Sequence, residues 1–146
     1  MHTVREILDT KGRQCWSISP KATVYEALQL MADKDIGALM VGEGGKVVGV
    51  FSERDYARKV ILKGRSSRDT LVSELMTSPI FAVGPDHTVE DCMALMTMKK
   101  LRHLPVIDEY VLSGVISIGD ILNSIITTQK ITIGNLESYM HGVKYQ

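Results

Sequence analysis

The chain has 146 residues and a mass of 16.2 kDa, with 45% hydrophobic and 23% charged residues. This length and composition are typical of one globular domain and exclude a disulfide-stapled miniprotein or a disordered chain. Seventeen basic residues balance seventeen acidic ones, so no bulk charge draws the protein toward nucleic acid or an anionic membrane. The two cysteines, the lack of a secretory signal and the lack of an apolar stretch near ~18 residues predict a soluble cytoplasmic protein.

An internal repeat organises the chain. The segment GVFSERD at Gly49–Asp55 returns as GVISIGD at Gly114–Asp120, 65 residues later. Upstream, VREIL at Val4–Leu8 matches VSELM at Val72–Met76 at an offset of 68, so the first copy is about three residues longer between these points. Matching segments in a fixed register predict two copies of one supersecondary unit.

Each copy is predicted to begin with a short apolar strand, followed by a helix. Thr23 and Thr88 are the expected helix N-caps, and Glu26 and Asp91, three residues later, can complete a capping box. Two strands joined by a hairpin come next, and a final helix opens at the serine of the repeated segment. The strands are expected at Cys15–Ile18, Ala38–Val41 and Lys46–Phe51, and at Ile80–Val83, Leu104–Ile107 and Leu112–Ile116, with turns at Gly42–Gly45 and Asp108–Tyr110.

The repeated unit is therefore β-α-β-β-α, which places the chain in the α/β class (α+β). Because the half-buried sheet of one copy cannot cover itself, the two copies are expected to pack on each other as a pseudo-two-fold pair. The expected division is repeat 1 at residues 1–62, a linker at 63–71, repeat 2 at 72–127 and a tail at 128–146. Ile133, Leu136, Tyr139 and Met140 predict a short amphipathic helix in the tail, which would dock on its own chain or on a second subunit.

These motifs resemble a tandem pair of CBS domains, also called a Bateman module. Both copies carry a Gly-apolar-apolar-Ser-x-x-Asp signature, and the second copy adds LRHLPVID at Leu101–Asp108. The likeness covers residues 4–126 and extends to small standalone bacterial CBS-pair proteins. It implies an adenosine-containing ligand, such as AMP, ADP, ATP, NAD(H) or S-adenosylmethionine. It also implies a flat homodimer in which the helices Thr23–Lys34 and Thr88–Lys100 supply the contact.

The signature has a chemistry of its own. A strand ends at Phe51 or Ile116 and leads to a helix N-terminus, where unpaired backbone N–H groups and the helix dipole favour an anion. The serine hydroxyl adds a donor for a phosphate oxygen, and the aspartate one turn later can accept from ribose hydroxyls. A simple helix N-cap with a capping-box acid would use the same spacing, so the residues alone leave both interpretations open.

The resemblance assigns one ligand-binding corner to each copy. Its residues are Ser52, Arg54 and Asp55 in the first copy, and Ser117, Gly119 and Asp120 in the second. Arg102 and His103 precede the second-copy strand and are candidates for phosphate contacts, although the pattern at position 103 also suits a buried histidine. The walls of the base pockets are expected from Ile18, Ile36, Ala38, Ile80, Leu104 and Pro105.

The expected function is a regulatory module that senses an adenosine ligand without catalysis, its occupancy changing how the copies and subunits are arranged. The alternative is a protein-interaction scaffold with vestigial nucleotide pockets, which would contact an unidentified regulated partner through the basic linker and the tail. A nucleotide hydrolase is a third hypothesis, but no nucleophile–base pair is evident. The four histidines lack metal-ligand spacing, so no metal site is expected.

Overall fold

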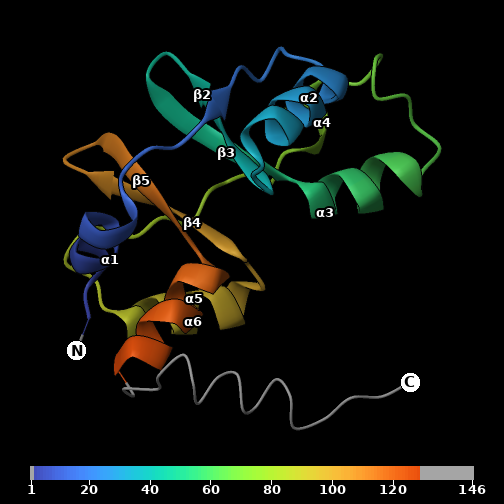
Figure 1. Ribbon diagram of the computed structural model, residues 1–146. Coiled ribbons are helices and arrows are strands. Elements are labelled where there is room, and N and C mark those ends of the chain that lie inside the picture. The colour runs from blue at the N-terminus through green and yellow to red at the C-terminus, as the bar shows by residue number, and fades with distance from the viewer. Residues whose placement is uncertain (1, 129–146) are drawn as a thin grey trace, which may run out of the picture.

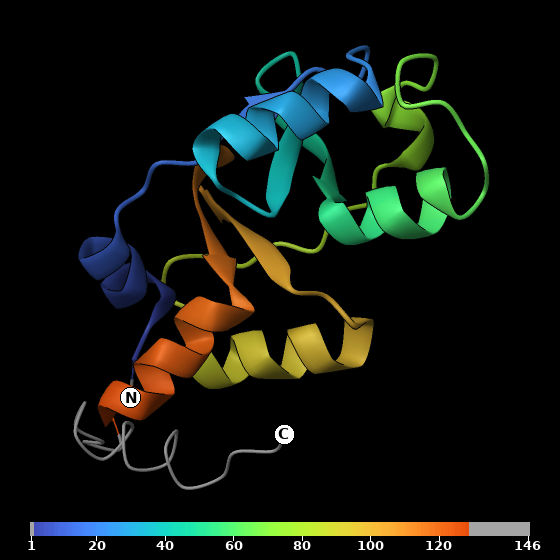
Figure 2. The same cartoon turned by 45° about the vertical axis from the view of Figure 1, so that its right-hand side comes forward.

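The computed structural model describes residues 2–128, so the helix predicted in the tail lies outside the described residues. The two repeats form an upper and a lower half, each with its own small sheet and helices (Figures 1 and 2). The helices are α1 (Val4–Lys11), α2 (Val24–Lys34), α3 (Glu53–Tyr56), α4 (Val72–Leu75), α5 (Val89–Lys99) and α6 (Ile118–Thr128), with a π-helical turn at Ala57–Ile61 after α3. The strands are β1 (Ser17–Ile18), β2 (Ala38–Glu43), β3 (Lys46–Ser52), β4 (His103–Asp108) and β5 (Val111–Ser117). Between residues 2 and 128, no helix combines the length and apolar character needed to cross a membrane.

The sheets confirm the predicted α+β fold with two copies of one unit. In the first sheet β1 pairs parallel with β2, and β2 pairs antiparallel with β3; in the second, β4 and β5 form an antiparallel hairpin. The strand β1 has two residues, fewer than predicted. The prediction of a strand at Ile80–Val83 is wrong, because only Val83 pairs, through a single parallel bridge to Val106. Pro79 and Pro85 flank that segment, and proline lacks the N–H that a strand ladder needs.

Both predicted hairpins are confirmed, with tighter turns than expected. Gly44 and Gly45 have φ of 59° and 80°, and Glu109 and Tyr110 have φ of 48° and 70°. Positive φ at both central residues is typical of a type I′ turn, whose twist matches that of the paired strands. The strands β2 and β4 therefore run further than predicted, into residues 42–43 and 108.

The predicted N-caps Thr23 and Thr88 begin α2 and α5, but of the two predicted capping boxes only the one with Asp91 forms. The Thr23 hydroxyl accepts the backbone N–H of Glu26 at 3.1 Å. The Thr88 hydroxyl accepts the N–H of Asp91 at 3.1 Å, and the Asp91 carboxylate accepts the N–H of Thr88 at 2.9 Å. This second bond closes the capping box and is the main reason that the pKa of Asp91 is lowered.

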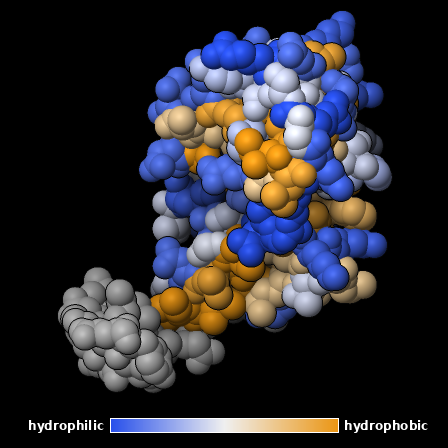
Figure 3. Space-filling model, turned by 90° about the vertical axis from the view of Figure 1, so that its right-hand side faces the viewer, coloured by the Kyte–Doolittle hydropathy of each residue, from blue (hydrophilic) through white to orange (hydrophobic). Residues whose placement is uncertain are grey.

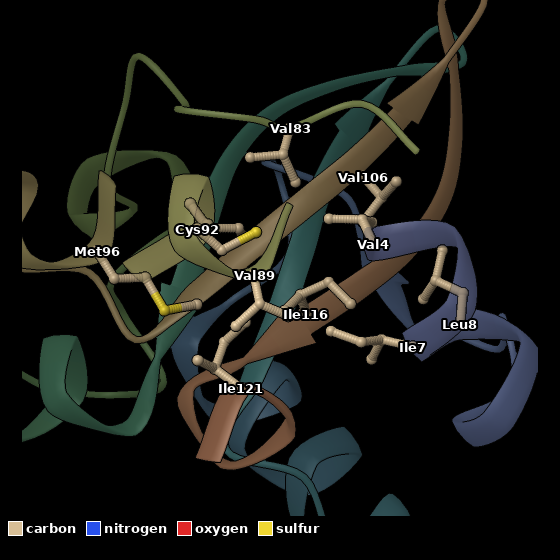
Figure 4. Packing of buried hydrophobic residues seen from close by; sticks show 11 residues of the cluster. Val4, Ile7, Leu8, Val83, Val89, Cys92, Met96, Val106, Ile116 and Ile121 are labelled. Carbon is tan, nitrogen blue, oxygen red and sulfur yellow. The ribbon is translucent and has the colours of Figure 1, made fainter. Parts of the chain in front are cut away.

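The two hydrophobic cores are interlocked, because each receives a helix from the other half of the sequence. The first core contains Val72 and Leu75 of α4 together with residues of the first repeat. The second contains Val4, Ile7 and Leu8 of α1, packed beside residues of α5, β4 and β5 (Figure 4). The division of the sequence into residues 1–62 and 72–127 stays a prediction, and each packed half combines parts of both blocks.

Glycine allows a close approach at two equivalent positions. A Cβ atom at Gly49 would lie 2.5 Å from Sδ of Met76, and one at Gly114 would lie 2.8 Å from Cδ2 of Leu8. Both distances are shorter than van der Waals contact, so these positions favour glycine at the start of each signature. Leu8 and Met76 therefore occupy equivalent places on the two hairpins.

Candidate functional site

A cavity of about 430 Å³ lies between the two repeats. Its walls come from the first signature and the helix after it, from the segment that follows α4, and from the start of β4. The lining residues are Gly37, Val50, Ser52, Glu53, Arg54, Asp55, Arg58, Lys59, Thr77, Pro79, Ile80, Phe81, Lys100, Leu101, Arg102 and His103. Figure 3 shows the side of the molecule on which α3 lies, where hydrophilic side chains gather across the middle, between hydrophobic groups above and below.

The first corner joins Ser52 and Asp55 in a capping box. The Ser52 hydroxyl accepts the Asp55 N–H at 3.2 Å, and one Asp55 carboxylate oxygen accepts the Ser52 N–H at 2.9 Å and the Ser52 hydroxyl at 3.0 Å. The other carboxylate oxygen accepts the Thr77 hydroxyl at 3.3 Å and lies 3.1 Å from the Lys59 ammonium. The carboxylate is thus held in one orientation on the cavity wall, with 12% of the side chain exposed.

Positive charge dominates the cavity wall. Five cationic side chains line it, against the carboxylates of Glu53 and Asp55. Arg102, and after it Arg58, lowers the pKa of Arg54, because the like charges lie close together. Within residues 2–128, none of these three arginines forms an ion pair. A bound anion would offset this charge.

Part of the wall is apolar and includes an aromatic ring. Ile80 and Phe81 line the cavity, and Phe81 is 37% exposed. An exposed ring of this kind can stack on a nucleobase. The Lys99 ammonium lies 4.9 Å from the centre of the Phe81 ring, and the Lys34 ammonium lies 4.2 Å from that of Trp16. The two pairs are related by the 65-residue register, which is a signal for Phe81 that the sequence interpretation missed.

The second corner has the same capping box in different surroundings. Asp120 accepts the Ser117 N–H at 2.8 Å, and the Ser117 hydroxyl accepts the Asp120 N–H at 3.1 Å. The Lys11 ammonium donates to this carboxylate at 2.7 Å and to the Val115 carbonyl at 2.8 Å. Asp120 lines a smaller cavity of about 220 Å³ together with residues of α1 and α6, whereas Ser117 and Gly119 line neither of these two cavities.

The residues predicted to form base pockets are scattered. Ile80 lines the larger cavity. The others lie in the cores or in a sheet: Ile18 and Ile36 pack against the first core, Leu104 and Pro105 are buried, and Ala38 is half-buried in β2 opposite Ser52. Their contact with a base stays a prediction.

Comparison with known proteins identifies the family. The sequence model of the CBS domain matches residues 4–62 and 72–127, one match per repeat. The chain belongs to the CBS-domain family. The resemblance predicted from the two signatures is thereby confirmed.

Similar CBS proteins are known from several organisms. A protein with CBS domains from Burkholderia ambifaria MC40-6 is 47% identical, covers 90% of this chain and 99% of its own, and superposes with a TM-score of 0.85. The mitochondrial CBS domain-containing protein CBSX3 of Arabidopsis thaliana is 34% identical over 96% of this chain and 72% of its own length. The CBS domain pair of protein MJ0100, in complex with 5′-methylthioadenosine and S-adenosylmethionine, is 21% identical, covers 88% of this chain and 98% of its own, and shares the fold at a TM-score of 0.78.

Arg102 and His103 reach the first corner from the second CBS repeat. Both line the larger cavity, and His103 pairs with Ser117 across β4 and β5. Burial lowers the pKa of His103; the charges of Lys11 and Arg102 lower it as well, and Asp120 opposes them. His103 therefore lies between the two corners.

The stability of this CBS pair is expected to fall as the pH drops below 6.5, the ordinary pKa of histidine. Below that pH the unfolded chain binds a proton at His103 more readily than the folded chain does. The free energy of unfolding therefore decreases as the pH falls from 6.5 toward the lowered pKa of His103 in the folded protein. Urea unfolding at about pH 7.5 and about pH 5.5 measures the effect. His103→Gln should lose less stability than the wild type, whereas His87→Gln, at an exposed position, should behave like the wild type. Equal losses in all three proteins would contradict this assignment.

Proposed function

We propose that this CBS pair is a regulatory module that binds an adenosine nucleotide in the larger cavity. The observation that carries the proposal is the composition of that cavity, whose wall contains Asp55 together with Arg54 and Arg102 from different repeats. Arginines bind phosphate oxygens through charge-assisted hydrogen bonds. Asp55 would accept from the ribose hydroxyls, and Phe81 would stack on the adenine.

The charge of the cavity supports a ligand that carries phosphate, such as AMP, ADP, ATP or NAD(H). Five cationic side chains against two carboxylates leave the wall positive, which attracts phosphates and repels the sulfonium of S-adenosylmethionine. The MJ0100 pair, which holds S-adenosylmethionine, is similar in fold at 21% identity, so we infer the ligand from the side chains of this chain. ATP, which carries the most negative charge of these compounds, is expected to bind most tightly.

A ligand in this cavity would touch both repeats, which supports a regulatory role. Ligand binding shifts the arrangement of two units by its difference in affinity for the alternatives, and here both units line the site. A homodimer is part of the proposal. Met93 on α5, and Ile118 and Leu122 on the adjacent α6, are 43%, 45% and 54% exposed, and such apolar side chains favour self-association.

The same corner supports binding without catalysis. The Ser52 hydroxyl is hydrogen-bonded to Asp55. The side-chain hydrogen bonds of the histidines in the described part of the chain join His2 to Glu6 and His87 to Gly84, and none reaches a signature serine. A serine nucleophile needs an adjacent base, so we infer that the module is not an enzyme.

Thermal denaturation of the full chain with AMP, ATP, NAD⁺ or S-adenosylmethionine tests the proposal. ATP at about 100 times its Kd should stabilise the fold by about 2.7 kcal/mol. The shifts with AMP and NAD⁺ should be smaller, and S-adenosylmethionine should give none. Light scattering on the same samples should give the mass of a dimer. No shift with any of the four compounds would favour the scaffold alternative, and a shift with S-adenosylmethionine alone would overturn the charge argument.

A further inference from the structure

The N-terminal helix α1 is one turn longer than its counterpart α4. Leu8 packs on Gly114 as Met76 packs on Gly49, which aligns the two helices residue by residue. In this register both helices begin at equivalent positions, but α4 has four residues and α1 has eight, ending at Lys11. The extra turn lies where the first copy has about three additional residues.

Lys11, on that extra turn, makes two hydrogen bonds equivalent to those that Thr77 makes in the first repeat. There, the N–H of Thr77 donates to the Val50 carbonyl at 2.8 Å, and its hydroxyl donates to Asp55 at 3.3 Å. In the second repeat the Lys11 ammonium donates to the equivalent β5 carbonyl at 2.8 Å and to Asp120 at 2.7 Å. One ammonium group therefore takes both acceptors and lies against the aspartate of the second signature.

We propose that Lys11 occupies the second corner as an internal ligand, so that this CBS pair binds one nucleotide, at the first corner. The inference rests on the proposed function. A ribose that approaches Asp120 has to displace an ammonium that is 35% exposed from a carboxylate that is 20% exposed, and separating a partly buried ion pair leaves an uncompensated charge. Asp55 at the first corner is also paired, with Lys59, but this corner lines the larger cavity together with Arg54 and Arg102. By contrast, Ser117 and Gly119 of the second corner line neither cavity.

Calorimetric titration of the full chain with ATP counts the occupied corners. The wild type is expected to bind one ATP per chain, and Lys11→Met two. Asp55→Ala removes the ribose acceptor of the first corner and should abolish the titration signal, and adding Lys11→Met to it should restore one bound ATP. Because Lys11→Met removes a positive charge, it weakens the general attraction for ATP, so a gain in binding would come from the opened corner.

Lys46→Met is the matched control, because it removes an exposed lysine at the start of β3 and leaves the second corner intact. It should bind one ATP per chain, and circular dichroism checks that each variant is folded. Two ATP molecules per wild-type chain, or no gain in either protein that carries Lys11→Met, would overturn the role of Lys11. ATP binding by Lys11→Met but not by the wild type would overturn the first-corner proposal alone. No binding by either would overturn both.

Discussion

Alanine at both Arg54 and Arg102 is expected to weaken ATP binding about 100-fold. Both guanidinium groups line the larger cavity, and neither has a carboxylate partner among the described residues. One charge-assisted hydrogen bond to a phosphate changes the affinity about tenfold. Because the two arginines belong to different repeats, the double variant removes phosphate contacts on both sides of the ligand. Isothermal titration at constant ionic strength measures the change in Kd.

The same double substitution is expected to leave the ligand-free protein as stable as the wild type, or more stable. Arg102 is the main cause of the lowered pKa of Arg54, so like charges repel each other there and their removal relieves the repulsion. The control removes Lys46 and Lys63, two exposed lysines outside the cavity wall, and should change the affinity for ATP far less. Wild-type affinity in the arginine variant would contradict the phosphate role, and a lower melting temperature without ligand would show that the arginines support the fold.

Features of the fold that depend on neighbouring residues could be predicted from the sequence. Thr23 and Thr88 begin α2 and α5 because a helix cap and its partner lie three residues apart. The strand expected at Ile80–Val83 depends instead on a partner that is distant in the sequence, and four apolar residues do not show whether that partner pairs with them. The packing of α1 in the second core is equally non-local, because its apolar face would suit either core.

The residues of the candidate site could be predicted where the two copies align in the 65-residue register. Arg102 lies far from Ser52 and Asp55 in the sequence, yet all three line one cavity. The register also suggests that the two corners are equivalent. They differ in the structure, because Lys11 lies against Asp120. Lys11 belongs to the segment where the first copy is longer, so no alignment of the two copies places it near the second signature.

Leu8→Ala is expected to lower the free energy of unfolding by about 2–5 kcal/mol, the range for truncating a buried leucine. Leu8 is 1% exposed and lies in the second core (Figure 4). Its side chain fills the space over Gly114. Its removal leaves a cavity between α1 and β5. Asp9, at an exposed position of the same helix, pairs with Arg13. Asp9→Ala should have little effect, because a surface ion pair contributes at most about 1 kcal/mol.

The same variant shows whether the interlocked repeats unfold as one unit. Trp16 is the single tryptophan and packs against the first core, so its fluorescence reports on the first repeat, whereas circular dichroism reports on the helices of both. Because α1 and α4 are exchanged between the cores, loss of Leu8 from the second core should shift the urea midpoint of both signals equally. If the Trp16 midpoint stayed at its wild-type value while the circular dichroism midpoint fell, the second repeat would unfold by itself. The exchange of helices would then join the repeats without coupling their stabilities.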